Sequence, residues 1–478
     1  MRKAPASTEA GAFACRLWCI LPIGDYSVNA QLTLDDLALL PPPARRAAIN
    51  ADGNKMLLQD KAAHDWYRFV LSYPPHLVRD YVSRFGLNGS HQVLDPFSGT
   101  GTTLVECKKL GIPSIGTEAN PMAHLAGLTK VDWCPDPCGL VTHAERVAGT
   151  ALTQLQADRV SENPVLCLED KQAYPLRRLP PECEPLLLSN SISPLPLHKT
   201  LVLLDALHQH HDERYARHEL LALAKVLVFR VSNLKFGPEV GVGSVKVDAP
   251  VITEWLTAVR AIADDLPALQ SLPQTPATVH HADARQLRYL FDPQSIDAVI
   301  TSPPYPNEKD YTRTTRLESV LLGFVRSKAD LQALKRGLLR SNTRGIYKGD
   351  DDDTWVAEHS EIQGIAAAIE KRRIELGKTS GFERLYARVT KLYFGGMARH
   401  LAEIRPLLRP NARLAYVVGD QMSYLRVMIR TGQLLADIAE RLGYEIIGID
   451  LFRTRLATAT GEQLREEVVV LRWPGERL

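Results

Sequence analysis

Short apolar runs that end in a polar residue recur along this chain of 478 residues. Between them lie longer stretches in which apolar residues are three or four positions apart. The first pattern is typical of buried β-strands, and the second is typical of helices that bury one face. The apolar runs predict strands at 91–95, 114–118, 278–283, 295–301, 412–419, 444–451 and 467–473.

The stretches between these strands predict helices at 77–85, 102–110, 393–408 and 434–442. Strands that alternate with helices form a parallel sheet with helices on both faces, whereas the last two strands are close enough in sequence to pair as an antiparallel hairpin. We therefore predict an α/β fold: a doubly wound, mostly parallel, Rossmann-like sheet that ends in an antiparallel hairpin and carries mainly helical insertions.

Two long segments interrupt this alternation. Segment 131–275 is rich in proline and contains the helical stretches 201–224 and 249–266, which indicates a mainly helical insertion. Segment 326–390 begins with a basic stretch, and we expect the acidic run 350–353 behind it to form an exposed loop. The predicted domain order is an N-terminal arm (1–65), three sheet segments (66–130, 276–325 and 391–478) and these two insertions between them.

Composition narrows the classes of function. The net charge is only +2, so any surface that binds nucleic acid has to be local. No apolar run reaches the ~18 residues that a membrane span needs. The apolar segment 13–23 carries Arg16 and lacks the small-residue cleavage site of a signal peptide. The seven cysteines fit no standard zinc-site spacing. We expect a cytoplasmic protein without a metal site and without a membrane partner.

The first candidate site is the stretch Asp95-Pro-Phe97-Ser-Gly99-Thr-Gly101-Thr-Thr103. It places a glycine-rich turn between a predicted strand and a predicted helix, where backbone N–H groups line a pocket and small residues admit a ligand. No lysine follows the last glycine, so this is not a phosphate-binding P-loop. Glu118 ends the next strand, where a carboxylate can accept both hydroxyls of a ribose. The pattern indicates a nucleotide-like cofactor.

The second candidate site is Thr301-Ser302-Pro303-Pro304-Tyr305, which directly follows another predicted strand. Asp283 ends the strand before it. All these residues follow the carboxyl ends of strands, where doubly wound sheets bind their ligands. A structural Pro-Pro turn packed by a tyrosine is the alternative, and the glycine loop upstream argues for a functional one.

Together, the two motifs resemble the amino-group DNA methyltransferases that use S-adenosylmethionine, of the type with a Thr-Ser-Pro-Pro-Tyr motif. The resemblance covers about half of the chain, roughly 66–130, 276–325 and 391–478. It implies a catalytic turn made of Ser302, Pro303, Pro304 and Tyr305. It also implies a site for S-adenosylmethionine built from Tyr73, Asp95, Phe97, Ser98, Gly99, Gly101, Thr102, Glu118, Asn120 and Asp283.

The residue types of the catalytic turn suit this chemistry. An exocyclic amine on cytosine or adenine is conjugated with its ring and is a poor nucleophile. The Ser302 hydroxyl and the Pro303 carbonyl can accept its hydrogen bonds and favour a pyramidal nitrogen aimed at the methyl donor. The two prolines stiffen the turn, and Tyr305 can stack on an extruded base. No Pro-Cys nucleophile is present in this turn, which argues against methylation of cytosine carbon 5.

Within the resembled family, a serine before Pro-Pro is associated with cytosine N4, and Asp or Asn with adenine N6. Ser302 therefore favours cytosine N4, with adenine N6 as the alternative. A tRNA base methyltransferase uses a similar pair of loops, but such enzymes usually carry an N-terminal RNA-binding module, and segment 1–65 shows no strand pattern. A protein-glutamine methyltransferase would have Asn at position 302, and a non-catalytic DNA-binding subunit would have a broken motif.

The expected partners are double-stranded DNA and a cognate restriction endonuclease, in a bacterial, nucleoid-associated setting. We expect both insertions to frame the DNA, with the basic stretch of the second one contacting phosphates. A solvated helix face is the alternative for that stretch. Its basic residues are Arg326, Lys328, Lys335, Arg336, Arg340, Arg344 and Lys348.

Overall fold

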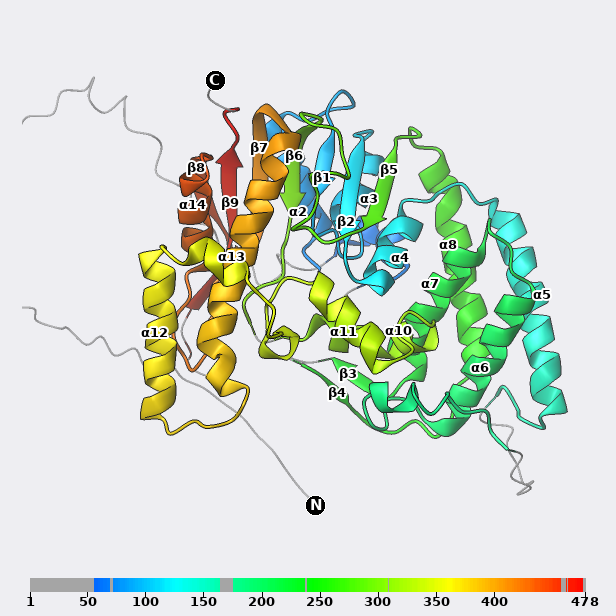
Figure 1. The fold of residues 1–478 in the computed structure, drawn as a ribbon. Helices are drawn as coiled ribbons and strands as arrows, with labels where there is room; N and C mark the ends of the chain where they lie inside the picture. Colours follow the sequence, from blue (N-terminus) through cyan, green and yellow to red (C-terminus); the bar gives the residue numbers. More distant parts are fainter. Residues whose placement is uncertain are drawn as a thin grey trace, which may run out of the picture. The chain divides into compact units, whose positions relative to one another are not determined.

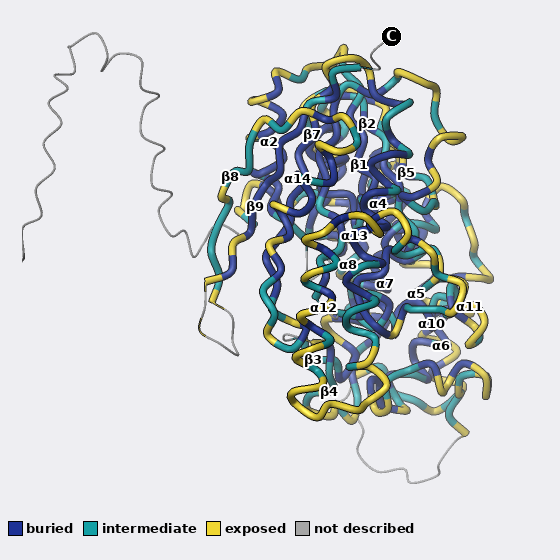
Figure 2. Tube along the Cα trace, turned by 60° about the vertical axis from the view of Figure 1, so that its left-hand side comes forward, coloured by how far each residue is buried: buried dark blue, intermediate teal, exposed yellow. Residues whose placement is uncertain are grey.

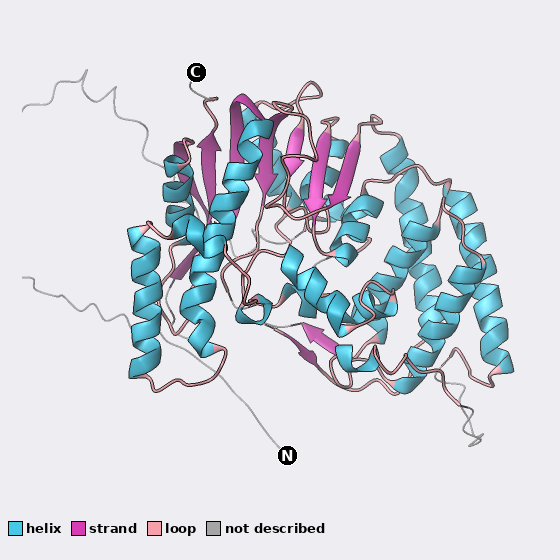
Figure 3. Ribbon diagram, in the orientation of Figure 1, coloured by secondary structure: helices cyan, strands magenta, loops and turns pink. Residues whose placement is uncertain are grey.

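A seven-stranded sheet organises the structure, which is a computed structural model (Figures 1 and 3). The order of the strands across the sheet is β5-β2-β1-β6-β7-β9-β8. Their bounds are β1 Val93–Asp95, β2 Ser114–Glu118, β5 Ala277–His281, β6 Ile296–Thr301, β7 Leu408–Gly419, β8 Glu445–Leu456 and β9 Gln463–Arg472.

The structure describes residues 56–68, 72–163, 175–236, 239–307, 309–456, 461 and 463–475. They belong to one unit, Ala47–Leu478, and the other unit, Met1–Arg46, lies outside the described residues. Most of the predicted arm 1–65 is therefore not described. In the part of the chain that is described, no helix is long and apolar enough to cross a membrane.

The pairing of the strands confirms the predicted fold class. Strands β5, β2, β1, β6 and β7 pair in parallel, and β9 runs antiparallel to both of its neighbours, β7 and β8. Crossover helices connect the parallel strands, so their carboxyl ends meet at one edge. Each predicted strand corresponds to one observed strand, with bounds that differ by a few residues.

Helices cover both faces of the sheet, as in doubly wound folds. Along β7, Leu414, Tyr416 and Val418 share a core with helices α13 and α14, whereas Ala415 and Val417 share a core with helix α2. This alternation follows from the two-residue period of a strand that is buried on both sides. The helices around the sheet are α2 Pro75–Phe85, α3 Thr102–Lys109, α4 Pro121–Lys130, α13 Tyr386–Ile404 and α14 Thr431–Arg441.

The first insertion is a helical bundle with one small hairpin. Its core includes Trp255 and Leu140 and is continuous with the core beneath α4. The predicted helical stretch 201–224 consists of two helices, since residues 210–215 between them form a turn. The elements are α5 Pro137–Ala157, α6 Pro194–Gln209, α7 Ala216–Val226, α8 Val251–Gln270, β3 Leu234–Phe236 and β4 Val240–Val242.

The second insertion adds short helices beside the catalytic half of the sheet. Ile362 and Ile369 of α12 are buried against the core that contains α13, whereas no residue of α11 is fully buried. Figure 2 shows the β3–β4 hairpin of the first insertion as mainly intermediate or exposed, in contrast to the dark sheet. Helices α9 Tyr311–Thr314 and α10 Arg316–Leu321 precede the insertion, and α11 Lys328–Gly337 and α12 Ser360–Glu375 lie within it.

Candidate functional site

The two predicted motifs line one cavity of about 490 Å³ at the carboxyl ends of the parallel strands. Two of the predicted site residues, Asp95 and Gly101, do not line it. The predicted residues that do line it are Tyr73, Phe97, Ser98, Gly99, Thr102, Glu118, Asn120, Asp283, Ser302, Pro303, Pro304 and Tyr305.

The glycine loop needs its two glycines for different reasons. Gly99 has φ +50°, and a Cβ placed there would meet nothing within 4 Å, so this position opens toward the cavity. Gly101 has φ +85°, and its Cβ would lie 3.0 Å from Cα of Gly127 on α4. Both adopt left-handed backbone angles that favour glycine. Gly101 thus serves the close packing of the loop on α4 rather than the lining of the cavity.

Glu118 is held in the cavity by backbone donors. Its carboxylate accepts hydrogen bonds from the N–H of Gly99 at 2.9 Å and from the N–H of Asn120 at 2.8 Å. Burial raises the pKa of Glu118 to about 7, although these two bonds act in the opposite direction. A carboxylate has about four lone-pair positions, so Glu118 retains acceptor capacity for a ligand. Asn120 caps α4 by accepting from the N–H of Met122.

Asp95 lies beneath the cavity and joins three segments. Its carboxylate is fully buried and accepts hydrogen bonds from the Thr301 hydroxyl at 2.6 Å, the Tyr73 hydroxyl at 3.2 Å and the N–H of Phe97 at 3.2 Å. Burial raises the pKa of Asp95 to about 6. Tyr73 also contacts the hydroxyl of Thr103. Asp95 therefore positions the glycine loop, the segment at Tyr73 and the strand that carries the catalytic turn.

The Ser-Pro-Pro-Tyr turn leaves β6 with its serine facing β7. The Ser302 hydroxyl donates to the carbonyl of Val417 at 3.2 Å, so its oxygen retains capacity to accept a hydrogen bond. The Tyr305 ring lies on Gly419, because a Cβ at this glycine would come within 2.9 Å of the ring. Burial raises the pKa of Tyr305, so the phenol is neutral near neutral pH.

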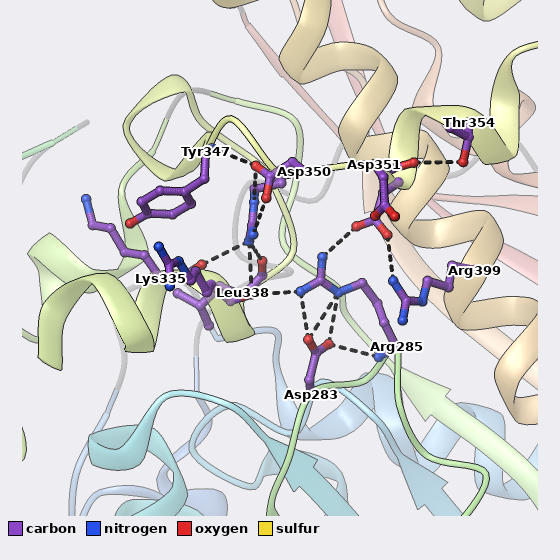
Figure 4. A network of polar contacts seen from close by, with 12 residues as sticks. Asp283, Arg285, Lys335, Leu338, Tyr347, Asp350, Asp351, Thr354 and Arg399 are labelled. Atoms are coloured by element: carbon purple, nitrogen blue, oxygen red, sulfur yellow. Dashed lines mark hydrogen bonds and ion pairs between the residues drawn. The ribbon is translucent and has the colours of Figure 1, made fainter. Parts of the chain in front are cut away.

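Asp283 is paired inside the protein. Arg285 donates from Nε to its Oδ1 at 3.0 Å and from its terminal nitrogen to Oδ2 at 2.7 Å (Figure 4). The backbone N–H of Arg285 also donates to Asp283 Oδ1 at 2.9 Å. Asp283 still lines the cavity, at the end where Glu118 and Asn120 lie, so it is an oriented acceptor rather than a free one.

Comparisons with known proteins indicate a DNA methyltransferase. A family model described as DNA methylase matches residues 53–126, which include the glycine loop and Glu118. The Type II methyltransferase M.BsoBI of Geobacillus stearothermophilus is 23% identical over 465 residues, which cover 89% of this chain and 86% of that protein. The Type II methyltransferase M.AvaI of Nostoc sp. is 23% identical over 470 residues, covering 90% and 89%. These matches support an amino-group DNA methyltransferase.

A solved structure, TrmN from Thermus thermophilus, aligns with 84% of this chain and 48% of that chain at 11% identity. The TM-score is 0.23, so the fold assignment of this chain rests on its own strand order and pairing rather than on this likeness.

Buried ion pairs connect the second insertion to the residues that line the cavity (Figure 4). Arg285 donates to Asp352 at 2.5 Å and to the carbonyl of Arg336 at 3.0 Å. Arg340 pairs with Asp350 through two bonds of 2.8 and 2.9 Å. The expectation that 350–353 forms an exposed loop is wrong for Asp352, which is 4% exposed, because Arg285 and Arg399 neutralise it inside the fold.

The basic stretch divides into two groups. Arg340 is buried against Asp350, and Lys335 forms an ion pair with Asp310 at 2.9 Å, so these two residues are used within the fold. The others are exposed, and they are Arg326, Lys328, Arg336, Arg344 and Lys348.

Several cavity residues were not identified from the sequence. Some follow the catalytic turn within a few residues, and this proximity was the available signal. Others follow β7 or lie on the β8–β9 hairpin, between the strands predicted at 444–451 and 467–473. The missed residues include Asn307, Lys309, Tyr311, Gln421, Phe452, Arg453, Arg455 and Glu466. Among the described residues, no group of three His, Cys, Asp or Glu side chains could hold a metal ion.

Proposed function

We propose that this protein is a DNA methyltransferase that transfers a methyl group from S-adenosylmethionine to the exocyclic amine of an extruded base, most favourably cytosine N4. The observation that carries the proposal is the shared cavity. The glycine loop follows β1 and the Ser-Pro-Pro-Tyr turn follows β6, and these strands are neighbours in the sheet. A donor held by the first loop would therefore lie beside an acceptor held by the second.

The residues at the glycine-loop end fit a nucleoside cofactor. Glu118 offers a carboxylate that backbone N–H groups already orient, which suits two ribose hydroxyls. Asp283 offers a second oriented acceptor that suits the amino group of an adenine. Gly99 leaves open space where a side chain would intrude. Held by these residues, S-adenosylmethionine would supply an electrophilic methyl group on a positively charged sulfur.

The residues at the other end fit a flat base that carries an amine. The Ser302 hydroxyl donates to Val417 and so presents lone pairs to the amine hydrogens, together with the carbonyl of Pro303. These two acceptors would draw the nitrogen lone pair out of conjugation and direct it at the methyl carbon. The Tyr305 ring, supported by Gly419, would stack on the base.

The identity of the base rests on Ser302. Serine before the two prolines favours cytosine N4 in the resembled family, and adenine N6 is the alternative. A tRNA base methyltransferase is a further alternative, but the curated relatives that align along most of this chain are named Type II methyltransferases. Those names support double-stranded DNA as the partner and a restriction–modification setting with a cognate endonuclease. The exposed basic residues of the second insertion would contact DNA phosphates.

The experiment is incubation of the purified full chain with tritiated S-adenosylmethionine and unmethylated duplex DNA, followed by nucleoside analysis. We expect label in N4-methylcytosine. Label in N6-methyladenine would overturn the base assignment and leave the reaction class intact. Label that enters only tRNA in a parallel incubation would refute the DNA substrate.

A further inference from the structure

A cluster of charged side chains occupies the cavity beside Tyr305. Lys309, Arg453, Arg455 and Glu466 all line the cavity. Arg453 donates from Nε to Glu466 at 2.5 Å, and Arg455 lies 3.4 Å from the other Glu466 oxygen. Glu466 in turn lies next to Tyr305, because a Cβ at Gly419 would meet both side chains. The cluster therefore lies against the ring that would stack on the base.

A β-bulge places these arginines. The pairing of β8 with β9 shifts between Leu451 and Arg453, and Arg453 then lies opposite Glu466. Strict alternation would send Phe452 and Arg453 to opposite faces of the sheet, yet both line the cavity. Bulges of this kind occur next to active sites, where they redirect side chains. The bulge in the hairpin thus places Arg453 and Arg455 at the cavity.

The charges of this cluster do not balance. Three cations, Lys309, Arg453 and Arg455, are close to two carboxylates, those of Glu466 and the exposed Glu239 on the β3–β4 hairpin. Among the described residues, the side-chain nitrogen of Lys309 and the terminal nitrogens of Arg453 have no hydrogen-bond partner. Other acids of the cavity are engaged, since Asp310 pairs with Lys335 and Asp283 with Arg285. In the part of the chain that is described, one positive charge of the cluster therefore remains without a counterpart.

Burial makes this surplus costly in the absence of an anion. The pKa of Lys309 is lowered, first by burial and next by the Arg455 charge. All three cations of the cluster also line the cavity. A ligand with one negative charge and several acceptor oxygens would neutralise the surplus and use the free donors.

We infer that Lys309, Arg453 and Arg455 form a subsite for the phosphodiester of the extruded target nucleotide. The inference rests on the proposed function, because only an extruded nucleotide brings its phosphate to this cavity. A phosphodiester carries one negative charge and matches the surplus, whereas the O2 atom of a cytosine is neutral. Lys309 follows Tyr305 by four residues, so one loop would contact both the base and its phosphate.

The carboxylate of a methionine moiety shares the chemistry of a phosphodiester oxygen, so the experiment has to separate the two sources. We favour the phosphodiester because the cluster lies against Tyr305 and the hairpin, whereas Glu118 and Asp283 mark the nucleoside end of the cofactor site. The affinity for S-adenosylmethionine in the absence of DNA therefore distinguishes a phosphodiester site from a carboxylate site.

The test compares Lys309→Gln with wild type in binding a duplex that contains the target site. We expect roughly tenfold weaker binding, the size of one lost charge-assisted contact, and a slope of log K against log salt that falls by about one. Lys309→Arg should restore both. Lys371→Gln, at an exposed position of α12, is the matched control and should change neither.

The second experiment removes the negative charge of the phosphate instead of the positive charge of Lys309. A methylphosphonate next to the target nucleotide should weaken binding by wild type about as much as Lys309→Gln does. The variant should lose nothing further on the modified duplex, because the contact is already absent. Fully additive losses would overturn the subsite. A weaker affinity for S-adenosylmethionine in the absence of DNA would assign the cluster to the cofactor and would also overturn it.

A third measurement tests whether the cluster recognises the base instead of the phosphate. If Lys309→Gln alters the preference between cytosine and adenine while the salt slope stays constant, the cluster reads the base and not the phosphate. Wild-type protein that methylates no duplex would instead refute the proposed function, independently of the binding data.

Discussion

The hydroxyl of Thr301 donates a 2.6 Å hydrogen bond to Oδ1 of Asp95, although 206 positions separate the two residues in the sequence. Asp95 ends β1 and precedes the glycine loop, and Thr301 ends β6 and precedes the catalytic turn. The bond therefore fixes the two loops of the cavity relative to each other. Since Asp95 is fully buried, each of its hydrogen bonds matters more than it would at the surface.

Thr301→Val tests this link. Valine keeps the shape of threonine but leaves the buried Asp95 carboxylate without one donor, so we expect a loss of about 1–3 kcal/mol in the free energy of unfolding. Methyl transfer should slow as well, because the turn that carries Ser302 loses its anchor. Denaturant unfolding and single-turnover kinetics measure the two effects. Thr301→Ser, which retains the hydroxyl, should approach wild type in both, and a valine variant as stable as wild type would contradict the prediction.

Alanine substitutions at Gly99 and Gly101 should have different effects on stability and on cofactor binding. Alanine at either position has a positive φ and should cost about 1–2 kcal/mol for that reason. At position 101 the added Cβ also meets the backbone of Gly127 at 3.0 Å, so Gly101→Ala should be clearly less stable than Gly99→Ala. Gly99→Ala should instead weaken cofactor binding, because its Cβ enters the cavity. Thermal unfolding and calorimetric titration separate the two outcomes, and equal stability of the two variants would refute the packing role of Gly101.

The sheet was predictable because its strands have strong local patterns. Runs such as 295–301 and 412–419 consist mainly of apolar residues, so their type and order followed from periodicity alone. The strand order then brought Glu118 and Ser302 to one edge of the sheet. Helix boundaries were less accurate, as the break between α6 and α7 shows.

The partners of buried charges were not predictable. Asp95 is in a loop that resembles a cofactor site, and only the fold shows that its partners are Thr301 and Tyr73. The run 350–353 has the composition of a solvated loop, yet Asp352 is buried because Arg285 lies beside it in space. Such pairings depend on distant segments that no local pattern connects.

Arg285 is predicted to hold the second insertion against the cavity. Arg285→Met removes the main partner of the buried Asp352, and an uncompensated buried charge should cost about 3 kcal/mol. The added substitution Asp352→Asn should recover part of this loss, because the buried charge is then removed. As a control, Arg372→Met breaks a half-exposed pair with Glu375 on α12 and should cost less than about 1 kcal/mol. Urea unfolding measures wild type and the three variants. A double variant that is no more stable than Arg285→Met alone would disprove the pairing.

Ser302→Ala tests the catalytic turn directly. The substitution removes the acceptor proposed for the amine hydrogens, and losing one such group should lower the rate of methyl transfer by about 10²–10³. Cofactor affinity should persist, because Glu118 and Asp283 are untouched. Single-turnover kinetics with saturating DNA measures the first quantity and calorimetry the second. An unchanged rate would remove Ser302 from the mechanism.

Glu118 predicts opposite pH trends for stability and for cofactor binding. Its folded pKa is about 7, raised by burial above the ordinary value of 4.5. The neutral form is thus favoured in the fold, so its contribution to stability is complete below pH 4.5 and is lost as the pH rises through 7. The size of this contribution is roughly 3 kcal/mol. Unfolding free energies of wild type and Glu118→Gln, measured from pH 4.5 to 8, should therefore differ in slope, with the glutamine variant falling less.

Cofactor binding should follow the reverse trend, because only the ionised Glu118 can accept both ribose hydroxyls. With a pKa of about 7, the ionised fraction rises about tenfold between pH 6 and pH 8, and the affinity for S-adenosylmethionine should rise with it. Calorimetric titrations at these two values measure the change, and Glu118→Gln should bind weakly at both. Binding that is independent of pH in the wild type would show that Glu118 does not contact the cofactor, even if its effect on stability is found.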